Sequence, residues 1–201
     1  MEVIKLQEAG YEQALLGLSL SFYDHKEPLA LWWNAEKFSR AERRAKALAH
    51  KGGGHNKFLE SIQVWLFVQA PRCWWSEFDT YRTGMTKNSS STMHTLDKRE
   101  TEAFDYETGT SQQVINAFNI SLQAYKNPES FFYKDITRLK MNLPEGWYQE
   151  RQISTNYMTL QNIIRQREGH RFHYWNTVFI KSVLEQVEHP YFLIKQENEN
   201  E

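Results

Sequence analysis

The segment from His55 to Gln69 constrains the fold more than any other part of this 201-residue chain. Its apolar side chains lie at alternate positions, and a repeat of two is typical of a β-strand. The intervening positions also hold apolar side chains, and a strand that is apolar on both faces belongs in the centre of a covered sheet. The alternating set is Ile62, Val64, Leu66 and Val68, and the intervening set is Trp65 and Phe67. The segment therefore predicts a central strand in an α/β fold.

Helical spacing of apolar residues predicts the elements that would cover this strand. Pro71 suits the first turn of one helix, and the glycines at 52–54 end another. The helices are expected over residues 6–22, 35–50, 71–81, 112–125, 128–139, 155–167 and 173–188. No repeat or low-complexity linker divides the chain, so we predict one domain over residues 1–195 and a polar tail over residues 196–201.

Two segments are expected to be loops. Residues 83–92 contain a glycine, a lysine, an asparagine and three consecutive serines, which suit turns and hydrogen bonds to a ligand. Residues 96–110 are acidic and poor in aliphatic side chains, and we interpret them as an excursion from the fold.

Composition limits the classes of function. The net charge of −1 supplies no global field for nucleic acid or a membrane, and no segment approaches the length of a membrane span. A single cysteine, Cys73, excludes a disulfide framework and a multi-thiolate zinc site, which makes the cytoplasm the expected compartment. His170 and His173 lack the further ligands that a metal site needs, so we predict none. Aromatic residues make up 14% of the chain, which favours ligand pockets or self-association.

The polar residues between the predicted elements match the needs of a nucleoside monophosphate. Such a ligand needs cations for its phosphate, amides and hydroxyls for its base edges, and an aromatic wall for its ring. Arg82, Asn88, Ser90 and Arg167 supply these groups beside aromatic residues. The alternative is structural, with Arg82 capping the end of its helix and Ser90 bonding only to its own loop.

The order of these residues resembles a known family. His55 is followed by the predicted strand, Ala70-Pro71, a helix, Thr80-Tyr81-Arg82, seven residues and Ser90. In the flavin-dependent thymidylate synthases a histidine, a strand ending in a small residue and proline, a helix, Arg-His-Arg, seven residues and a serine follow one another. Later, Lys140 precedes Leu-Pro as an arginine does in the family, and a helix carries Asn156, Leu160, Asn162 and Arg167 at the family's separations.

The resemblance implies a mostly antiparallel sheet flanked by helices and a site for a pyrimidine deoxynucleotide such as dUMP. A reduced flavin, FAD, would supply hydride, a folate would supply a one-carbon unit, and sites would form between the subunits of a homotetramer. The residues carried over are Arg82 and Ser90 as catalytic groups, Glu77, Arg82, Ser90, Lys140 and Arg167 for the nucleotide, and His55, Asn88, Asn156 and Asn162 for the cofactor.

Several family positions are altered, which leaves three functions open. Thr80 and Tyr81 replace the first two residues of the Arg-His-Arg triplet, Asn88 replaces a glutamate and Thr92 replaces an arginine. The chain could be an active flavoenzyme or a silent relative that binds a nucleotide or a protein. The third hypothesis is nucleic-acid binding through the basic face from Arg40 to Lys51, against which the balanced charge argues.

Overall fold

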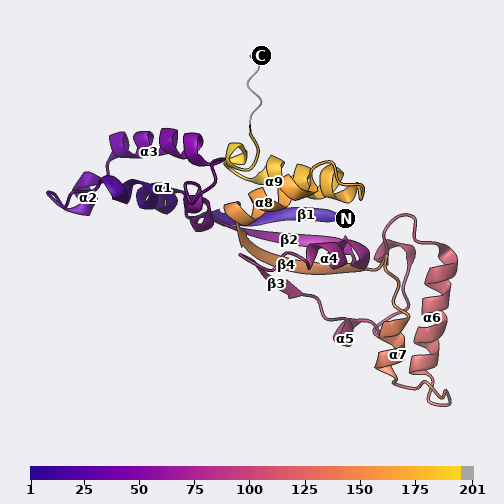
Figure 1. Cartoon of the computed structure of the whole chain (residues 1–201). Helices are drawn as coiled ribbons and strands as arrows, with labels where there is room; N and C mark the ends of the chain where they lie inside the picture. Colours follow the sequence, from indigo (N-terminus) through magenta and orange to yellow (C-terminus); the bar gives the residue numbers. More distant parts are fainter. Residues whose placement is uncertain (196–201) are drawn as a thin grey trace. The chain divides into compact units, whose positions relative to one another are not determined.

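The computed structural model describes residues 1–195, and the predicted tail at 196–201 lies outside them (Figure 1). Contacts divide the chain into two compact units. The first unit comprises Met1–Glu2, Val68–Thr80 and Lys87–Gln152. The second unit comprises Val3–Phe67, Tyr81–Thr86 and the chain from Ile153 onward. The single domain expected over 1–195 stays a prediction.

One four-stranded antiparallel sheet confirms the predicted fold class. Its order is β1-β2-β4-β3, from β1 (Glu2–Ala9), β2 (Gln63–Pro71), β3 (Thr86–Ser89) and β4 (Tyr148–Asn156). Strand β2 confirms the predicted central strand, because Val64, Leu66 and Val68 are at most 1% exposed. Its start is later than predicted, since a short 3-10 helix, η2 (Lys57–Ser61), precedes it.

The helix predicted over residues 6–22 is wrong in its first part. Residues 2–9 form β1, and α1 (Tyr11–Ser19) begins only after Gly10, whose φ of 94° is a conformation that glycine adopts readily. The short 3-10 helix η1 (Leu20–Phe22) ends the segment. Strand β1 is an edge strand, and the Gln186 side chain protects it by accepting from the Lys5 N–H at 2.7 Å and donating to the Val3 carbonyl at 2.9 Å.

Helices make up most of the second unit. They are α2 (Leu29–Trp32), α3 (Ala35–Leu48), α8 (Tyr157–Arg167), the π-helical η4 (Trp175–Ile180), α9 (Lys181–Gln186) and η5 (Pro190–Phe192). Three of these regions confirm the helices predicted over 35–50, 155–167 and 173–188, and the π-helical η4 forms the first half of the last one. Ala41 and Ala45 are fully buried on α3, and these small side chains let α1 and α3 approach closely.

The first unit contains α4 (Arg72–Phe78), α5 (Thr92–Thr95), η3 (Ala103–Asp105), α6 (Gln112–Lys126) and α7 (Ile136–Met141). The helix predicted over 128–139 is wrong before Ile136, because turns fill residues 127–135 and Lys134 has a φ of 57°. The acidic excursion packs on α6, since Leu96 joins Phe118 and Leu122 in a buried cluster. None of the helices in the described residues is long and apolar enough to cross a membrane.

Replacing Gly10 by alanine should destabilise the protein. A β-carbon there would lie 2.3 Å from the Ser61 backbone oxygen, at a φ that costs an L-residue energy. We expect a loss of about 2–4 kcal/mol in the free energy of unfolding, measured by chemical denaturation. The control is Gly17→Ala in α1, where the β-carbon meets nothing within 4 Å and should add roughly 0.5–1 kcal/mol. Equal effects of the two substitutions would contradict this account.

Candidate functional site

A pocket of about 550 Å³ in the first unit collects polar side chains from β2, β4 and the segment after β3. Its size lies within the usual range for small-molecule sites. Two strands and a structured excursion therefore form its walls. The lining residues are Gln69, Ser90, Thr92, Thr95, Leu96, Lys98, Arg99, Thr101, Phe104, Asp105, Trp147, Tyr148 and Glu150.

Ser90 is fixed in this pocket by strand β4. Its backbone N–H donates to the Glu150 carbonyl at 2.9 Å, and its hydroxyl donates to Glu150 Oε2 at 2.9 Å. The Gln149 amide also donates to the Ser90 carbonyl at 3.3 Å. Ser90 therefore bonds well beyond its own loop, to residues 60 positions away in sequence.

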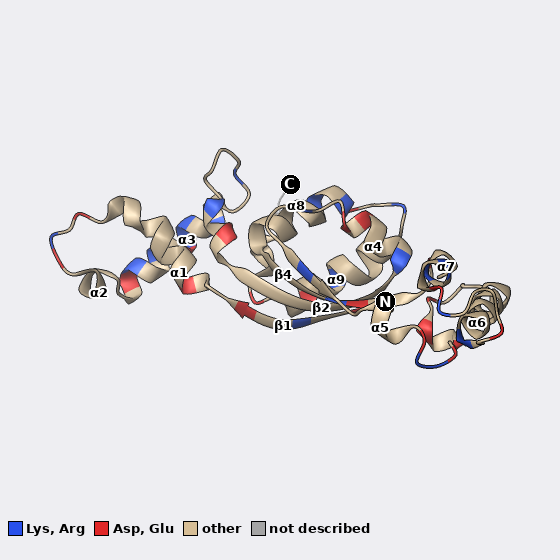
Figure 2. Cartoon of the chain, turned by 90° about the horizontal axis from the view of Figure 1, so that it is seen from below, with Lys and Arg blue, Asp and Glu red and all other residues tan. Residues whose placement is uncertain are grey.

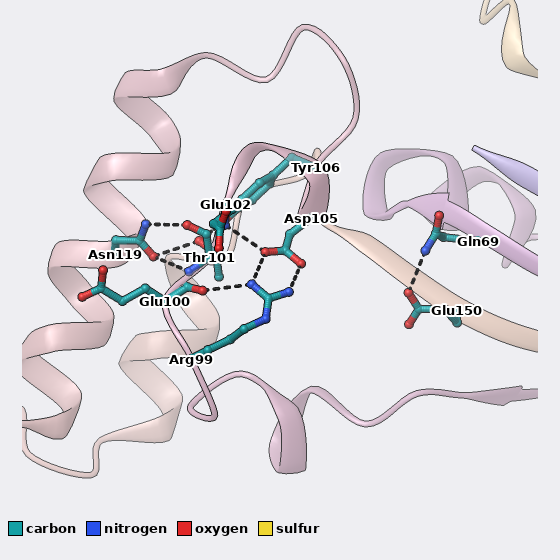
Figure 3. Close-up of polar contacts among 9 residues, drawn as sticks. All are labelled: Gln69, Arg99, Glu100, Thr101, Glu102, Asp105, Tyr106, Asn119 and Glu150. Atoms are coloured by element: carbon teal, nitrogen blue, oxygen red, sulfur yellow. Dashed lines mark hydrogen bonds and ion pairs between the residues drawn. The ribbon is translucent and has the colours of Figure 1, made fainter.

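Gln69, Glu150 and Ser90 form a short row of hydrogen-bonded polar side chains. The Gln69 Nε2 donates to Glu150 Oε1 at 3.1 Å, across the paired strands β2 and β4 (Figure 3). All three residues are half-buried, and each carboxylate oxygen of Glu150 accepts one side-chain hydrogen bond. A carboxylate has about four acceptor positions, so about two have no protein donor among the described residues.

A second cluster comes from the excursion and α6 (Figure 3). Arg99 bonds the Asp105 carboxylate through both terminal nitrogens and donates to the Glu100 carbonyl at 2.9 Å. The Asp105 carboxylate raises the pKa of Arg99 above its usual value, so the guanidinium stays charged and paired. Thr101 is buried and bonds the Asn119 side chain at 2.8 Å, which holds the excursion on α6.

Two cations hold the segment that leads to Ser90. Lys87 and Arg151 bond the Asp79 carboxylate at 3.0 and 2.7 Å. Burial alone would raise the pKa of Asp79, but the hydrogen bonds from Lys87 and Arg151 outweigh it and lower this pKa. The charged carboxylate therefore links α4, β3 and β4 in the first unit.

Tyr81 and Arg167 meet in the second unit. The Arg167 Nε donates to the Tyr81 hydroxyl at 2.8 Å, and its Nη1 lies 3.0 Å from His170 Nε2. The guanidinium also lies over the Trp175 ring, 4.6 Å from its centroid. The guanidinium is therefore held by a hydroxyl, an imidazole and an aromatic face.

The second unit also contains a larger pocket of about 930 Å³, between α1, α3, η2 and the loop at residues 52–55. His55 is exposed and lines it, as do Lys57 and Arg44. The Arg44 guanidinium stacks on the Phe22 ring, 3.9 Å from its centroid. This pocket offers cations, an imidazole and an exposed ring.

Comparison with protein-family models gives no match, and comparison with curated proteins gives no significant one. Solved structures do match. Flavin-dependent thymidylate synthase ThyX from Helicobacter pylori, complexed with FAD and dUMP, gives a TM-score of 0.68 at 16% identity, over 96% of this chain and 98% of that one. The chain has the fold of the flavin-dependent thymidylate synthases. A second ThyX structure from the same organism with FAD and dUMP gives a TM-score of 0.68 at 15% identity, covering 97% and 98%.

A third solved structure with a similar fold is that of a nucleotide methylase. The UMP/dUMP methylase PolB from Streptomyces cacaoi, bound with 5-Br dUMP, gives a TM-score of 0.54 at 13% identity, over 94% of this chain and 92% of that one. Structures with the thymidylate synthase fold thus include proteins crystallised with dUMP or its bromo derivative.

Residues chosen by resemblance to the thymidylate synthases occupy different surroundings. Ser90 lines the smaller pocket and His55 lines the larger one. Asn156 caps α8 by accepting from the Thr159 N–H at 2.9 Å, and Asn162 accepts from Arg165 at 3.2 Å, so both have structural bonds. Of the remaining residues carried over from the family, Glu77 and Arg167 are half-buried, and Arg82, Asn88 and Lys140 are exposed.

Reasoning from the sequence missed most of the Ser90 pocket. Gln69 is the last residue of the predicted strand, and its polarity at the end of an apolar segment is the signal that could have indicated it. Glu150 and Arg99 carried no signal, because β4 was not predicted and the excursion was not placed.

The basic face of α3 is mixed, since Arg40 pairs with Glu36 and Lys46 with Glu42 (Figure 2).

Removing the Tyr81 hydroxyl should destabilise the second unit. Tyr81→Phe keeps the ring beside Trp175 but removes the acceptor of the Arg167 Nε–H. We expect a loss of about 1 kcal/mol in the free energy of unfolding, measured by denaturant titration. The control is Tyr133→Phe, whose exposed hydroxyl makes no hydrogen bond within the described residues. Equal stability of Tyr81→Phe and the native protein would show that the bond contributes nothing.

Proposed function

We propose that this chain binds a pyrimidine deoxynucleotide such as dUMP in the pocket lined by Ser90. The observation that carries the proposal is that Ser90, selected by its spacing from Arg82, lines a pocket of suitable size in a fold whose solved examples include dUMP complexes. An amide, a carboxylate, hydroxyls and aromatic rings line the same pocket, and these groups recognise a base and a sugar.

The charges of the pocket support a neutral base at its centre. Arg99 is paired with Asp105, and Lys98 makes no ion pair within the described residues. Glu150 places a negative charge beside Ser90. The base is therefore proposed at Glu150, and the phosphate toward Lys98, because like charges repel.

We further propose that the pocket lined by His55 holds part of FAD. Arg44 and Lys57 supply cations for a diphosphate, and Phe22 supplies a ring for stacking, so the donor set fits a flavin nucleotide. A bound reduced flavin would supply hydride, and a folate would be the one-carbon donor of an active enzyme. The resemblance to the family assigns Arg82 to the pyrimidine and Arg167 and Lys140 to the nucleotide, but none of these three residues lines the pocket that contains Ser90.

A second candidate is nucleotide binding without catalysis. The specific observation is that Tyr81, which stands where the family has histidine, bonds Arg167. A guanidinium already held by a hydroxyl and an imidazole is less available to a phosphate. The expected homotetramer and cytoplasmic location stay predictions in either case.

A nucleotide that binds the folded protein should stabilise it. We expect dUMP at 100 times its dissociation constant to add ~2.7 kcal/mol to the free energy of unfolding, measured by thermal shift. Ser90→Ala removes a hydroxyl from the pocket and should raise the dissociation constant roughly tenfold. The control is Ser121→Ala on α6, whose exposed hydroxyl bonds only its own helix. No stabilisation of the native protein by dUMP would overturn the proposal.

Arg82→Ala tests the role of Arg82 by itself, because it leaves Arg167, the other arginine carried over from the family, unchanged. Arg82 is exposed and makes no ion pair within the described residues, so its removal should leave the unfolding free energy nearly unchanged. The resemblance to the family implies weaker dUMP binding in this variant, although Arg82 does not line the pocket that contains Ser90, and titration calorimetry would measure the change. Binding that survives unchanged would remove Arg82 from the nucleotide site while leaving Ser90 in place.

The cofactor proposal predicts a coloured protein. Purified chain incubated with FAD and then desalted should keep the visible absorbance of an oxidised flavin, and His55→Ala should lower the retained fraction. The control is His94→Ala, which lies outside the pocket that His55 lines. A colourless native protein without thermal stabilisation by FAD would favour binding without flavin chemistry.

A further inference from the structure

The Glu150 carboxylate and the Gln69 amide present an acceptor beside a donor in one pocket wall. Gln69 uses one N–H on Glu150 Oε1, and its second N–H makes no hydrogen bond within the described residues. Glu150 keeps open acceptor positions after bonding Ser90 and Gln69. The two groups are held in register by the pairing of β2 with β4.

The edge of a uracil ring has the complementary pattern. Its N3–H is a donor, and a carbonyl oxygen that accepts lies on each side of it. A carboxylate that accepts the N3–H makes a charge-assisted bond, which is roughly twice as strong as a neutral one. The second Gln69 N–H would donate to the neighbouring carbonyl oxygen, which gives a two-point contact.

We propose that Glu150, together with Gln69, selects the base by accepting its N3–H, which makes Glu150 a specificity-determining residue. The inference rests on the proposed function, because it places the base in the pocket lined by Ser90. Ser90 acts in this arrangement as a positioning residue, since its hydroxyl holds Glu150 Oε2 and its backbone N–H holds the Glu150 carbonyl. Lys98 and Arg99, which belong to the excursion, also line this pocket, and the proposal places the sugar and phosphate toward them.

The electrostatics of the pocket agree with this orientation. The Glu150 carboxylate accepts hydrogen bonds from two uncharged donors and makes no ion pair within the described residues. An ionised carboxylate attracts an N–H and repels a phosphate. A ligand whose edge carries a methyl group in place of the N3 proton offers no donor and pushes a methyl against the carboxylate.

The test compares dUMP with its N3-methyl derivative on the native protein and on Glu150→Gln by titration calorimetry. For the native protein we expect N3-methylation to raise the dissociation constant roughly 10- to 100-fold. In Glu150→Gln we expect dUMP itself to bind more weakly, and the effect of methylation to shrink to a few-fold, because the two changes remove the same bond.

Controls separate selection of the base from support of the fold. Glu129→Gln makes the same change of charge at an exposed position of the first unit that does not line the pocket, and it should keep the native response to methylation. If Glu150→Gln weakens both ligands by the same factor, the carboxylate only supports the pocket and the inference is wrong. If the native protein binds no dUMP at all, the proposed function fails first.

Discussion

Burial of strand β2 on both faces is the constraint on which the rest of the structure depends. Val64, Leu66, Val68 and Ala70 are almost fully buried, and the residues between them are half-buried. Such a strand needs hydrogen-bonding partners on both edges, which β1 and β4 supply. Pro71 then ends the strand and leads into α4. Gln69 is a polar, half-buried exception near that end, and its side chain faces a pocket with a carboxylate partner.

The elements that were predictable are those whose apolar residues follow a clear period. Strand β2, helix α3, helix α6 and helix α8 have such periods and lie where the sequence indicates. Strand β1 does not, because Ile4 and Leu6 are exposed on an edge strand and only Val3 is buried. Its weak alternation resembles the pattern of a helix, although Gly10 marks the true boundary between β1 and α1.

Strand β4 was missed for a different reason, which concerns the site itself. Its first five residues are Tyr-Gln-Glu-Arg-Gln, so they lack the apolar alternation that predicts a strand. Those polar residues carry the hydrogen bonds that fix Ser90 and Gln69. The polar residues that line the pocket therefore gave this strand no apolar period from which it could be predicted.

The candidate site could be predicted only where its residues keep a fixed spacing along the chain. Ser90 followed from its separation from Arg82, but its partner Glu150 lies 60 residues away, and Gln69 lies 81 residues from Glu150. Such pairs depend on which strands are neighbours and in what register, and neither can be read from the spacing of single residues. The same limit applies to Arg99, whose pairing with Asp105 depends on how the excursion packs against α6.

The altered family positions and the charges of the pocket together favour one orientation of a nucleotide in the pocket that contains Ser90. Thr92 carries no charge where the family has an arginine, and Asp105 neutralises Arg99 in the same pocket. The pocket is left with one ammonium, Lys98, and one carboxylate, Glu150. Because a phosphate dianion beside Glu150 would be repelled and a base N–H would be attracted, the proposed nucleotide would have its base at Glu150 and its phosphate toward Lys98. In the proposed arrangement, loss of an arginine weakens phosphate binding more than base recognition, since the base would be bound by side chains of two paired strands.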